Sequence, residues 1–320
     1  MILKVPVVLF TFNRPDLTAR VISALSPSKP KTLYFVSDGP RDGVSEDLGK
    51  VHKTRSLLSL VDWDCEVVTI FSDVNLGLPD RFFSALDQVF QIEKWAIILE
   101  DDCLPGPDFF VYARRLLEMY EGDDRVGIIS GHNFAPSTRD FASGYFFSKT
   151  GFIWGWATWG SVWANFTQEF RVSEFSRDQV IEVKGTFSSN VEKFFVTRLM
   201  RILPTLQTWD IQFNHFLRAS NKVNAVPAVN LVENIGFTSD ATHTVPTPWH
   251  YPNPALDLGA EIESKVPPEE SVREVRRLWR RKLLRMASAI VRFYLVRFRS
   301  NLLPRDSAGR KLKTHPAKHG

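Results

Sequence analysis

One stretch of the chain decides the fold. It reads Trp-Ala-Ile-Ile-Leu-Glu-Asp-Asp and occupies residues 95–102. Its first five residues form an apolar run of strand length, which is typical of a strand buried on both faces of a sheet. Glu100, Asp101 and Asp102 follow this run directly. Because uncompensated buried carboxylates are unfavourable, the stretch predicts a strand that ends at a binding site for a cation.

Strand and helix patterns alternate ahead of this stretch. Runs rich in β-branched and aromatic residues predict strands over 5–12, 32–37 and 65–71. Segments with helical spacing of apolar residues separate them, over 15–25, 47–61 and 79–90. Such alternation predicts an α/β fold whose mainly parallel sheet is flanked by helices.

Polar residues follow each predicted strand. Asn13, Asp38 and Asn75 come after the first three strands, and the acidic triplet comes after the fourth. The carboxyl ends of parallel strands share one edge of a sheet, and ligands bind in the crevice outside that edge. We therefore expect these side chains to line one ligand-binding edge.

The second half of the chain continues the mixed pattern. It predicts a helix over 107–121, a strand over 126–130 and a Trp-rich segment over 144–166. A long helical segment over 168–203, a helix opened by Trp-Asp over 209–217 and a strand over 223–232 follow. Residues 246–270 hold six prolines, which is typical of an extended linker.

Composition excludes several classes of protein. The chain has 320 residues, of which 44% are hydrophobic and 24% are charged, so it is neither disordered nor a small disulfide-stapled scaffold. Two cysteines cannot build a disulfide framework or a four-thiolate zinc site. Residues 1–265 hold 25 basic and 32 acidic residues, so we expect no nucleic-acid binding by the main domain.

The acidic triplet admits two interpretations. It is either a solvated acidic turn that precedes a helix, or a site for Mg²⁺ or Mn²⁺, which prefer oxygen ligands and keep positions open for water or substrate. The position of the triplet at the end of a buried strand favours the metal.

Residues 98–110 resemble a known family. They read Ile-Leu-Glu-Asp-Asp-Cys-Leu-Pro-Gly-Pro-Asp-Phe-Phe, which resembles the Glu-Asp-Asp region of the N-acetylglucosaminyltransferase I type of glycosyltransferase. Leu-Phe-Thr-Phe-Asn-Arg-Pro (9–15), Ser-Asp-Gly (37–39) and Asn-Leu-Gly-Leu (75–78) are similar to bacterial family-2-like glycosyltransferases. The resemblance covers residues 5–245 and implies a GT-A-like (Rossmann-like) fold that binds a nucleotide-sugar, with a UDP-sugar favoured.

The resemblance also implies roles for single residues. Asp102 would coordinate Mn²⁺ or Mg²⁺ at the donor diphosphate, while Glu100 and Asp101 would approach the ribose or the sugar. Asn13 and Arg14 would border the nucleotide. Two further residues are assigned to donor binding: Asp38, which would face the base, and Asn75.

Asp210 is the candidate catalytic base. Trp209-Asp210 resembles the Trp-Asp segment that carries the base in that family, and Asp210 would take the proton of an acceptor hydroxyl in an inverting transfer. The resemblance implies a glycan or lipid-linked acceptor. From the residues alone, an Asp that caps the helix N-terminus is the favoured interpretation, and the resemblance favours the base.

Two further assignments concern the donor sugar and the metal. Trp154, Gly155 and Trp156 are expected to form the exposed part of the Trp-rich segment, as an aromatic wall over the sugar. His243 lies in a loop of small residues and is a candidate metal ligand, or a plain surface histidine.

The C-terminal tail is strongly basic. Residues 271–299 hold ten Lys and Arg against one acidic residue, with apolar residues at helical spacing, which is typical of an amphipathic helix on an anionic membrane surface. A solvated basic tail and an RNA-binding segment are the alternatives. We expect a cytoplasmic protein peripherally associated with the inner face of the membrane.

These observations combine into one hypothesis. The chain is predicted to be a metal-dependent inverting glycosyltransferase, with surface polysaccharide biosynthesis as the setting that the resemblance implies. Its predicted parts are one domain over 1–250 (nucleotide-binding half 1–105, acceptor half 106–250), a linker over 251–270 and a tail over 271–320. The rivals are a nucleotidyltransferase, which usually has a Gly-rich loop after its first strand, and a non-catalytic membrane-associated glycan-binding protein on a degenerate transferase fold.

Overall fold

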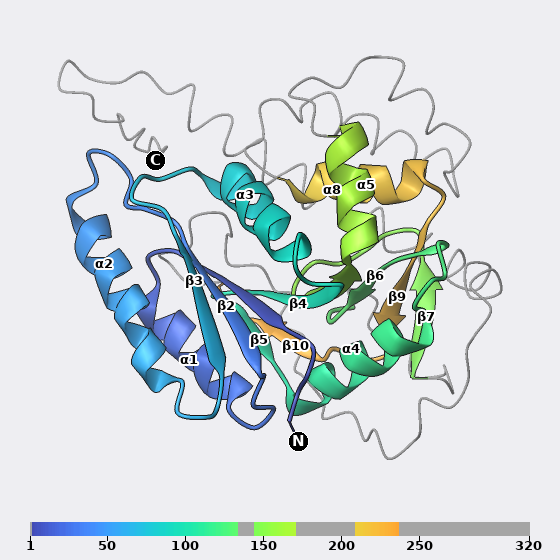
Figure 1. Cartoon of the computed structure of the whole chain (residues 1–320), viewed down its shortest axis with the longest axis horizontal. Coiled ribbons are helices and arrows are strands. Elements are labelled where there is room, and N and C mark those ends of the chain that lie inside the picture. Colours follow the sequence, from blue (N-terminus) through green and yellow to red (C-terminus); the bar gives the residue numbers. More distant parts are fainter. Residues whose placement is uncertain (1, 134–143, 171–208, 237–320) are drawn as a thin grey trace, which may run out of the picture. The chain divides into compact units, whose positions relative to one another are not determined.

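The computed structural model describes residues 2–133, 144–170 and 209–236, all within the unit Met1–Leu278 (Figure 1). Eight strands form the main sheet in the order β3-β2-β1-β4-β8-β6-β9-β7. Their bounds are β1 Val7–Thr11, β2 Thr32–Ser37, β3 Glu66–Phe71, β4 Trp95–Glu100, β6 Val126–Ser130, β7 Tyr145–Ser148, β8 Trp156–Trp159 and β9 Val223–Pro227. A separate antiparallel pair consists of β5 Cys103–Pro105 and β10 Val232–Asn234.

The described helices are α1 Pro15–Leu25, α2 Ser45–Ser56, the 3₁₀ helix η1 Leu57–Leu60, α3 Leu78–Phe90, α4 Pro107–Met119, α5 Gly160–Phe170 and α8 Asp210–Ala219. Pro15, Pro79 and Pro107 stand in the first turns of α1, α3 and α4, where a missing N–H leaves no hydrogen bond unmade. These helices begin where the sequence predicts them. None of the helices in the described ranges is both long and apolar enough to cross a membrane.

The sheet confirms the predicted fold class, a mainly parallel sheet flanked by helices. β3, β2, β1 and β4 are mutually parallel, and β6 and β9 run in the same direction, whereas β7 and β8 are antiparallel to their neighbours. The single strand predicted over 223–232 is wrong, because the structure breaks it into β9 and β10, which belong to different sheets. Residues 171–208, the linker over 251–270 and the basic tail over 271–320 lie outside the described residues.

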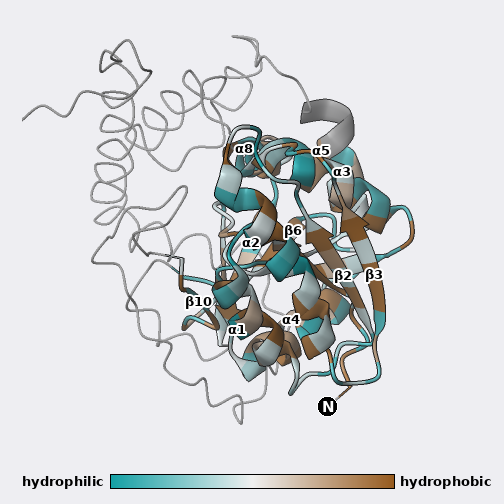
Figure 2. Cartoon of the chain, turned by 90° about the vertical axis from the view of Figure 1, so that its left-hand side faces the viewer, coloured by the Kyte–Doolittle hydropathy of each residue, from teal (hydrophilic) through white to brown (hydrophobic). Residues whose placement is uncertain are grey.

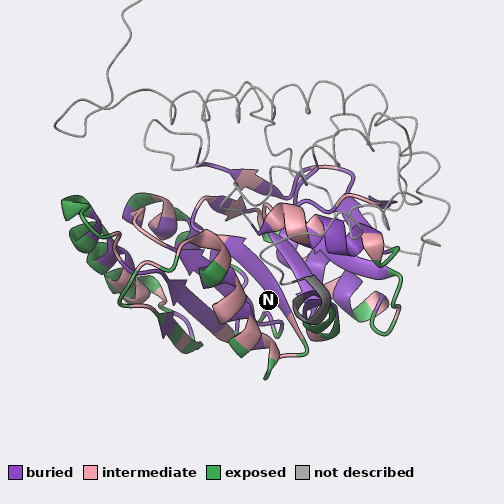
Figure 3. Cartoon of the chain, turned by 90° about the horizontal axis from the view of Figure 1, so that it is seen from above, coloured by how far each residue is buried: buried purple, intermediate pink, exposed green. Residues whose placement is uncertain are grey.

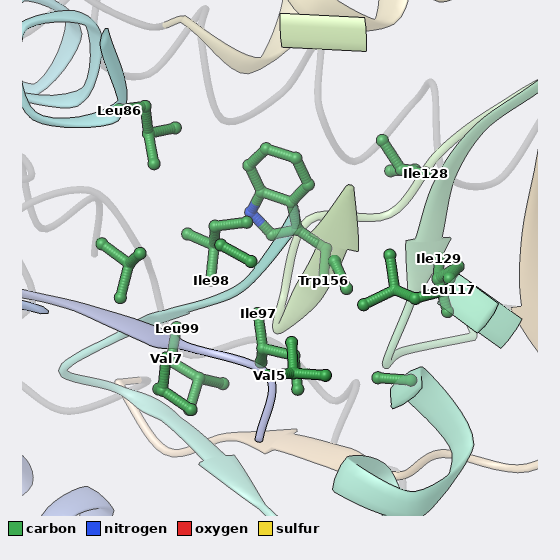
Figure 4. Packing of buried hydrophobic residues seen from close by; sticks show 14 of the residues in the cluster. Val5, Val7, Leu86, Ile97, Ile98, Leu99, Leu117, Ile128, Ile129 and Trp156 are labelled. Atoms are coloured by element: carbon green, nitrogen blue, oxygen red, sulfur yellow. The ribbon is translucent and has the colours of Figure 1, made fainter. Parts of the chain in front are cut away.

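The core lies on both faces of the central strands. In Figure 4, Leu86 of α3 lies on the side of the sheet toward which the Trp156 ring points, and Leu117 of α4 lies beside Ile129 on the other side. Hydrophobic residues colour the strands in Figure 2, and the strands are largely buried in Figure 3, whereas exposed residues gather on outer helices and loops. The edge strand β3 is the exception, since most of its residues are exposed or half-buried.

Candidate functional site at the carboxyl edge of the sheet

The strand order creates a switch point between β1 and β4. From β1 the chain moves to β2 and β3 on one side, and it returns to place β4 on the other side of β1. A crevice opens at such a point outside the carboxyl ends of the strands. Arg14 follows β1 there, and the acidic triplet begins at the last residue of β4, so the structure brings these predicted site residues together.

Arg14 pairs with the triplet. Its Nη1 donates a hydrogen bond of 2.9 Å to Asp102 Oδ2 and lies 3.6 Å from Asp101 Oδ1. The backbone N–H of Phe12 donates to Asp101 Oδ2 at 3.3 Å. The side chains of Arg14, Asp102 and Asp101 are 17%, 13% and 10% exposed, so the carboxylates lie in a site with little water.

The carboxylates repel one another. Burial, followed by the negative charges of Asp102, Asp101 and Asp210, raises the pKa of Glu100 well above its ordinary value. Burial also raises the pKa of Asp101 to about 7, although the nearby Arg14 opposes the shift. Arg14 therefore offsets the burial of these carboxylates only in part. Because Asp101 and Asp102 are so little exposed, the interpretation of the triplet as a solvated acidic turn is wrong.

Asp210 joins this cluster from the second half of the chain. It is the first residue of α8, and its carboxylate is close enough to Glu100 to raise the pKa of that residue. The N-cap of α8 is Trp209, and no side-chain hydrogen bond caps the helix, so the interpretation of Asp210 as an N-cap is wrong. Asp210 instead lies near Glu100 of the triplet, which is more than a hundred residues earlier in the sequence.

Trp209 fixes the start of α8. Its indole is 1% exposed, and it stacks on Phe82 of α3 with ring centroids 4.5 Å apart. Phe82 in turn stacks on Phe10 of β1 at 3.8 Å. This column of rings connects the strand beside the triplet to the helix that carries Asp210.

The small sheet lies against Asp102. β5 follows the triplet and pairs with β10, and the N–H of Ile235 donates to the carbonyl oxygen of Asp102 at 2.8 Å. A side chain at Gly236 would overlap the carboxylate of Asp102. Glycine at this position therefore allows the chain to pass directly over the Asp102 carboxylate.

Asp38 and Asn75 hold a loop together. Asp38 Oδ1 accepts hydrogen bonds from the N–H groups of Gly39 and Leu76, and Oδ2 accepts from Asn75 Nδ2 and the N–H of Gly77. Asp38 is 6% exposed. Both residues lie at the predicted edge, but their side chains shape the loop before α3, and the predicted contact of Asp38 with a base stays a prediction.

The predicted aromatic wall requires a correction. Trp156 is 1% exposed and belongs to the core of β8, and Gly155 is also buried, so the expectation that they form an exposed surface is wrong. Trp156 is buried because it lies in a central strand and packs against Trp209 and Phe213. Trp154, which precedes the strand, is half-buried and stays a candidate for a sugar contact.

The sequence interpretation missed His132. This residue follows β6, which is parallel to β4 and ends at the same edge of the sheet. Its ring lies 4.7 Å from the Trp154 ring, and burial lowers its pKa to about 4, so His132 is neutral at pH 7. A polar residue directly after a predicted strand was the available signal, as it was for Asn13 and Asp38.

The chemistry of the cluster fits a divalent cation. Within the described ranges, no three acidic, His or Cys side chains converge as a complete set of metal ligands. The carboxylate oxygens, whose ionised forms burial disfavours without a counter-charge, suit a hard cation that takes one or two carboxylates and completes its shell with phosphate oxygens. The other candidate ligand, His243, lies outside the described residues.

The fold and this edge define an α/β protein with an acidic cluster at its switch point. No family model matches the sequence, and no curated protein matches it. Several solved structures are similar at a low level. A mannosyltransferase from Pyrobaculum calidifontis in complex with GDP-Man and Mn²⁺ is 14% identical, over 69% of this chain and 70% of that chain, with a TM-score of 0.37.

A UDP-glucose pyrophosphorylase is 7% identical, over 73% of this chain and 93% of that chain, with a TM-score of 0.37. Glucosyl-3-phosphoglycerate synthase from Mycobacterium tuberculosis, in complex with Mn²⁺, UDP and phosphoglyceric acid, is 14% identical, over 40% of this chain and 42% of that chain, with a TM-score of 0.27. These neighbours are glycosyltransferases and a sugar nucleotidyltransferase. Similarity at this level assigns no family and no activity to the chain.

Proposed function

We propose that the protein is a metal-dependent glycosyltransferase that moves a sugar from a nucleotide-sugar, with a UDP-sugar favoured, to a glycan or lipid-linked acceptor with inversion. One observation carries this proposal. Arg14, the triplet and Asp210 come from three separate parts of the chain and converge outside the switch point of a parallel sheet. A cluster of buried carboxylates that lacks sufficient counter-charge would suit a cation with the diphosphate on one side and a hydroxyl to be deprotonated on the other.

Each residue has a distinct role in this proposal. Asp102 would hold Mn²⁺ or Mg²⁺ with His243 as a further candidate ligand, and the cation would supply Lewis-acid stabilisation of the leaving diphosphate. Arg14 holds Asp102 in place and adds a positive charge at the same edge. Asp210 accepts the proton of the acceptor hydroxyl as its oxygen attacks the anomeric carbon from the side opposite the diphosphate.

The role of Asp210 is supported by its surroundings. The carboxylate of Asp210 lies close enough to Glu100 to contribute to the raised pKa of that residue, so the proposed base lies beside the triplet that would hold the cation. The column of Phe10, Phe82 and Trp209 holds the start of α8 rigidly. A base on a rigid element keeps its geometry toward a bound hydroxyl.

A first experiment measures nucleotide binding and turnover separately. The full chain is incubated with UDP-, GDP-, CMP- and dTDP-sugars in the presence of Mn²⁺ or EDTA, and thermal stabilisation and release of nucleoside diphosphate are recorded. Asp102→Asn is expected to abolish the metal-dependent stabilisation. Asp210→Asn is expected to keep that stabilisation and to lower turnover about 10²- to 10⁴-fold. Asp64→Asn, an exposed site before β3, is the control and is expected to change neither.

Each rival has its own signature in this assay. Release of pyrophosphate in place of a nucleoside diphosphate would identify a nucleotidyltransferase, although Asn13-Arg14-Pro15 stands where that class usually has its Gly-rich loop. Nucleotide-sugars that neither stabilise the protein nor turn over would support the non-catalytic glycan-binding hypothesis. A product of retained anomeric configuration, observed by NMR, would refute inversion.

The setting of the reaction belongs to the same proposal. We propose a cytoplasmic enzyme held at the inner face of the membrane through residues 271–299, acting in surface polysaccharide biosynthesis. The ten basic residues of this segment support binding to anionic lipid. Flotation of the full chain with anionic vesicles, and not with zwitterionic ones, is the expected result, and equal recovery with both would contradict it.

A further inference from the structure

The loop after β2 carries Arg41, whose guanidinium is hydrogen-bonded to the buried carboxylate of Asp47. Arg41 Nε donates to Asp47 Oδ2 at 2.6 Å, and Arg41 Nη2 donates to Asp47 Oδ1 at 3.0 Å, which is the two-point geometry that orients a guanidinium. The backbone N–H of Arg41 donates to Asp47 Oδ2 at 3.2 Å. The whole residue is therefore fixed to the first turn of α2.

Asp47 also connects this loop to the switch point. Asn13 Nδ2 donates to Asp47 Oδ1 at 2.7 Å, and Asn13 precedes Arg14, which pairs with Asp102. Asp47 is 1% exposed, and the hydrogen bond from Arg41 lowers its pKa to about 2, so the carboxylate stays ionised. One buried charge thus positions the loop after β2 relative to the loop after β1.

The outer edge of Arg41 remains available to a ligand. Its side chain is 39% exposed, and Nη1 makes no hydrogen bond to the residues that the structure describes. The guanidinium lies over the Phe12 ring, 5.4 Å from its centroid. Because the Phe12 backbone is bound to Asp101, Arg41 lies on the same edge as the acidic cluster.

The order of the strands separates Arg41 from the diphosphate end. β1 lies between β2 and β4, and neighbouring strands are about 4.8 Å apart, so the end of β2 lies roughly 10 Å from the end of β4. A nucleotide whose diphosphate lies at the triplet after β4 spans this distance with its ribose and base. Arg41 therefore lies nearer to the expected position of the base than to that of the phosphates.

Asp38, the residue predicted to face the base, already accepts four hydrogen bonds within its own loop. A carboxylate has about four acceptor positions, and Gly39, Leu76, Gly77 and Asn75 occupy four. Arg41 offers a donor instead. A donor can pair with a carbonyl oxygen, which uracil, thymine, cytosine and guanine carry and adenine lacks.

We propose that Arg41 determines base specificity by donating a hydrogen bond to a carbonyl oxygen of the nucleotide base, and that Asp47 is the positioning residue that holds Arg41 for this contact. This inference rests on the proposed function, because it needs a nucleotide bound across the switch point. In this proposal the loop 38–47 recognises the nucleotide base, whereas the acidic triplet binds the diphosphate through the cation.

The test compares nucleotides with a ligand that has no base. Binding of UDP, GDP, ADP and inorganic pyrophosphate to the full chain is measured by calorimetry with Mn²⁺. Arg41→Ala is expected to weaken binding of the preferred nucleoside diphosphate about tenfold and to leave pyrophosphate binding unchanged. Arg41→Lys is expected to restore little, because lysine lacks the planar fork. Arg114→Ala, which removes a surface pair with Glu118 on α4, is the control and should change neither.

Asp47→Asn tests the positioning role. Like Arg41→Ala, it is expected to weaken binding of the nucleoside diphosphate and to leave pyrophosphate binding unchanged. General destabilisation of the protein would not change the ratio of the two affinities. Arg41→Ala keeps the test decisive if Asp47→Asn fails to fold, since Arg41 is a partly exposed residue. Equal losses for UDP and pyrophosphate, or no loss for either, would overturn the assignment of Arg41. Failure of the wild type to bind any nucleoside diphosphate would overturn the proposed function itself.

Discussion

Arg14→Met tests the electrostatics of the cluster directly. Arg14 Nη1 lies 2.9 Å from Asp102 and 3.6 Å from Asp101, and all three side chains are less than one-fifth exposed. Removing one partner of a buried ion pair leaves uncompensated charge and typically costs about 3–5 kcal/mol. We expect the free energy of unfolding to fall by about that amount at pH 8, measured by urea denaturation in EDTA.

The loss should depend on pH in a defined direction. The pKa of Asp101 is raised to about 7, so the native protein keeps a proton that the unfolded chain releases from about pH 4 upward. The stability of the wild type therefore decreases as the pH rises through this window. Without Arg14 the pKa of Asp101 rises further, so the stability of the variant continues to decrease to higher pH. The difference in free energy of unfolding between the variant and the wild type therefore widens as the pH rises.

The expected size follows from the pKa. If the pKa of Asp101 rises by one further unit, the loss should be about 1 kcal/mol smaller at pH 5.5 than at pH 8. A larger rise increases this difference to at most about 1.4 kcal/mol, because pH 8 is only one unit above the wild-type pKa. Arg114→Met removes an exposed pair with Glu118 and should cost roughly 0.5 kcal/mol or less at both pH values. A loss for Arg14→Met that is the same at both pH values, or below 1 kcal/mol at pH 8, would refute the view that Arg14 offsets buried negative charge.

Two further predictions concern packing around the site. Trp209→Ala should lower the free energy of unfolding by about 3–5 kcal/mol, because the buried indole stacks on Phe82 and lies against Trp156, and Trp209→Phe should cost clearly less in the same urea titration. Gly236→Ala should cost about 1–3 kcal/mol and weaken the Mn²⁺-dependent thermal shift, because the added methyl overlaps the Asp102 carboxylate. Gly49→Ala in α2 meets no atom within 4 Å and should slightly stabilise the protein, so a loss there equal to that of Gly236→Ala would contradict the steric explanation.

The sequence by itself determined the alternating architecture and the edge on which the polar residues gather. The apolar run at 95–99 ends within one residue of the end of β4, and 32–37 is β2. Short runs rich in apolar, β-branched and aromatic residues between helical segments favour strands covered on both faces of a sheet. Once the strands are parallel, residues such as Asn13, Asp38 and Asp102 must follow carboxyl ends and share an edge. These properties depend on residues that are close together in the sequence, so the sequence alone is enough to predict them.

Only the tertiary structure decided which side chains meet there. Arg14 and Asp102 are 88 residues apart, and the approach of Asp210 to Glu100 depends on the column of rings that seats α8. The exposure of the tryptophans depended on strand β8, whose place between β4 and β6 buries Trp156 and leaves Trp154 at its end half-buried. Asp38 faces its own loop, and the outer edge of Arg41 is left open to solvent, because hydrogen bonds across the fold fill the acceptors of Asp38 and orient Arg41 on Asp47. Such pairings depend on distances through space, which residue spacing along the chain does not contain.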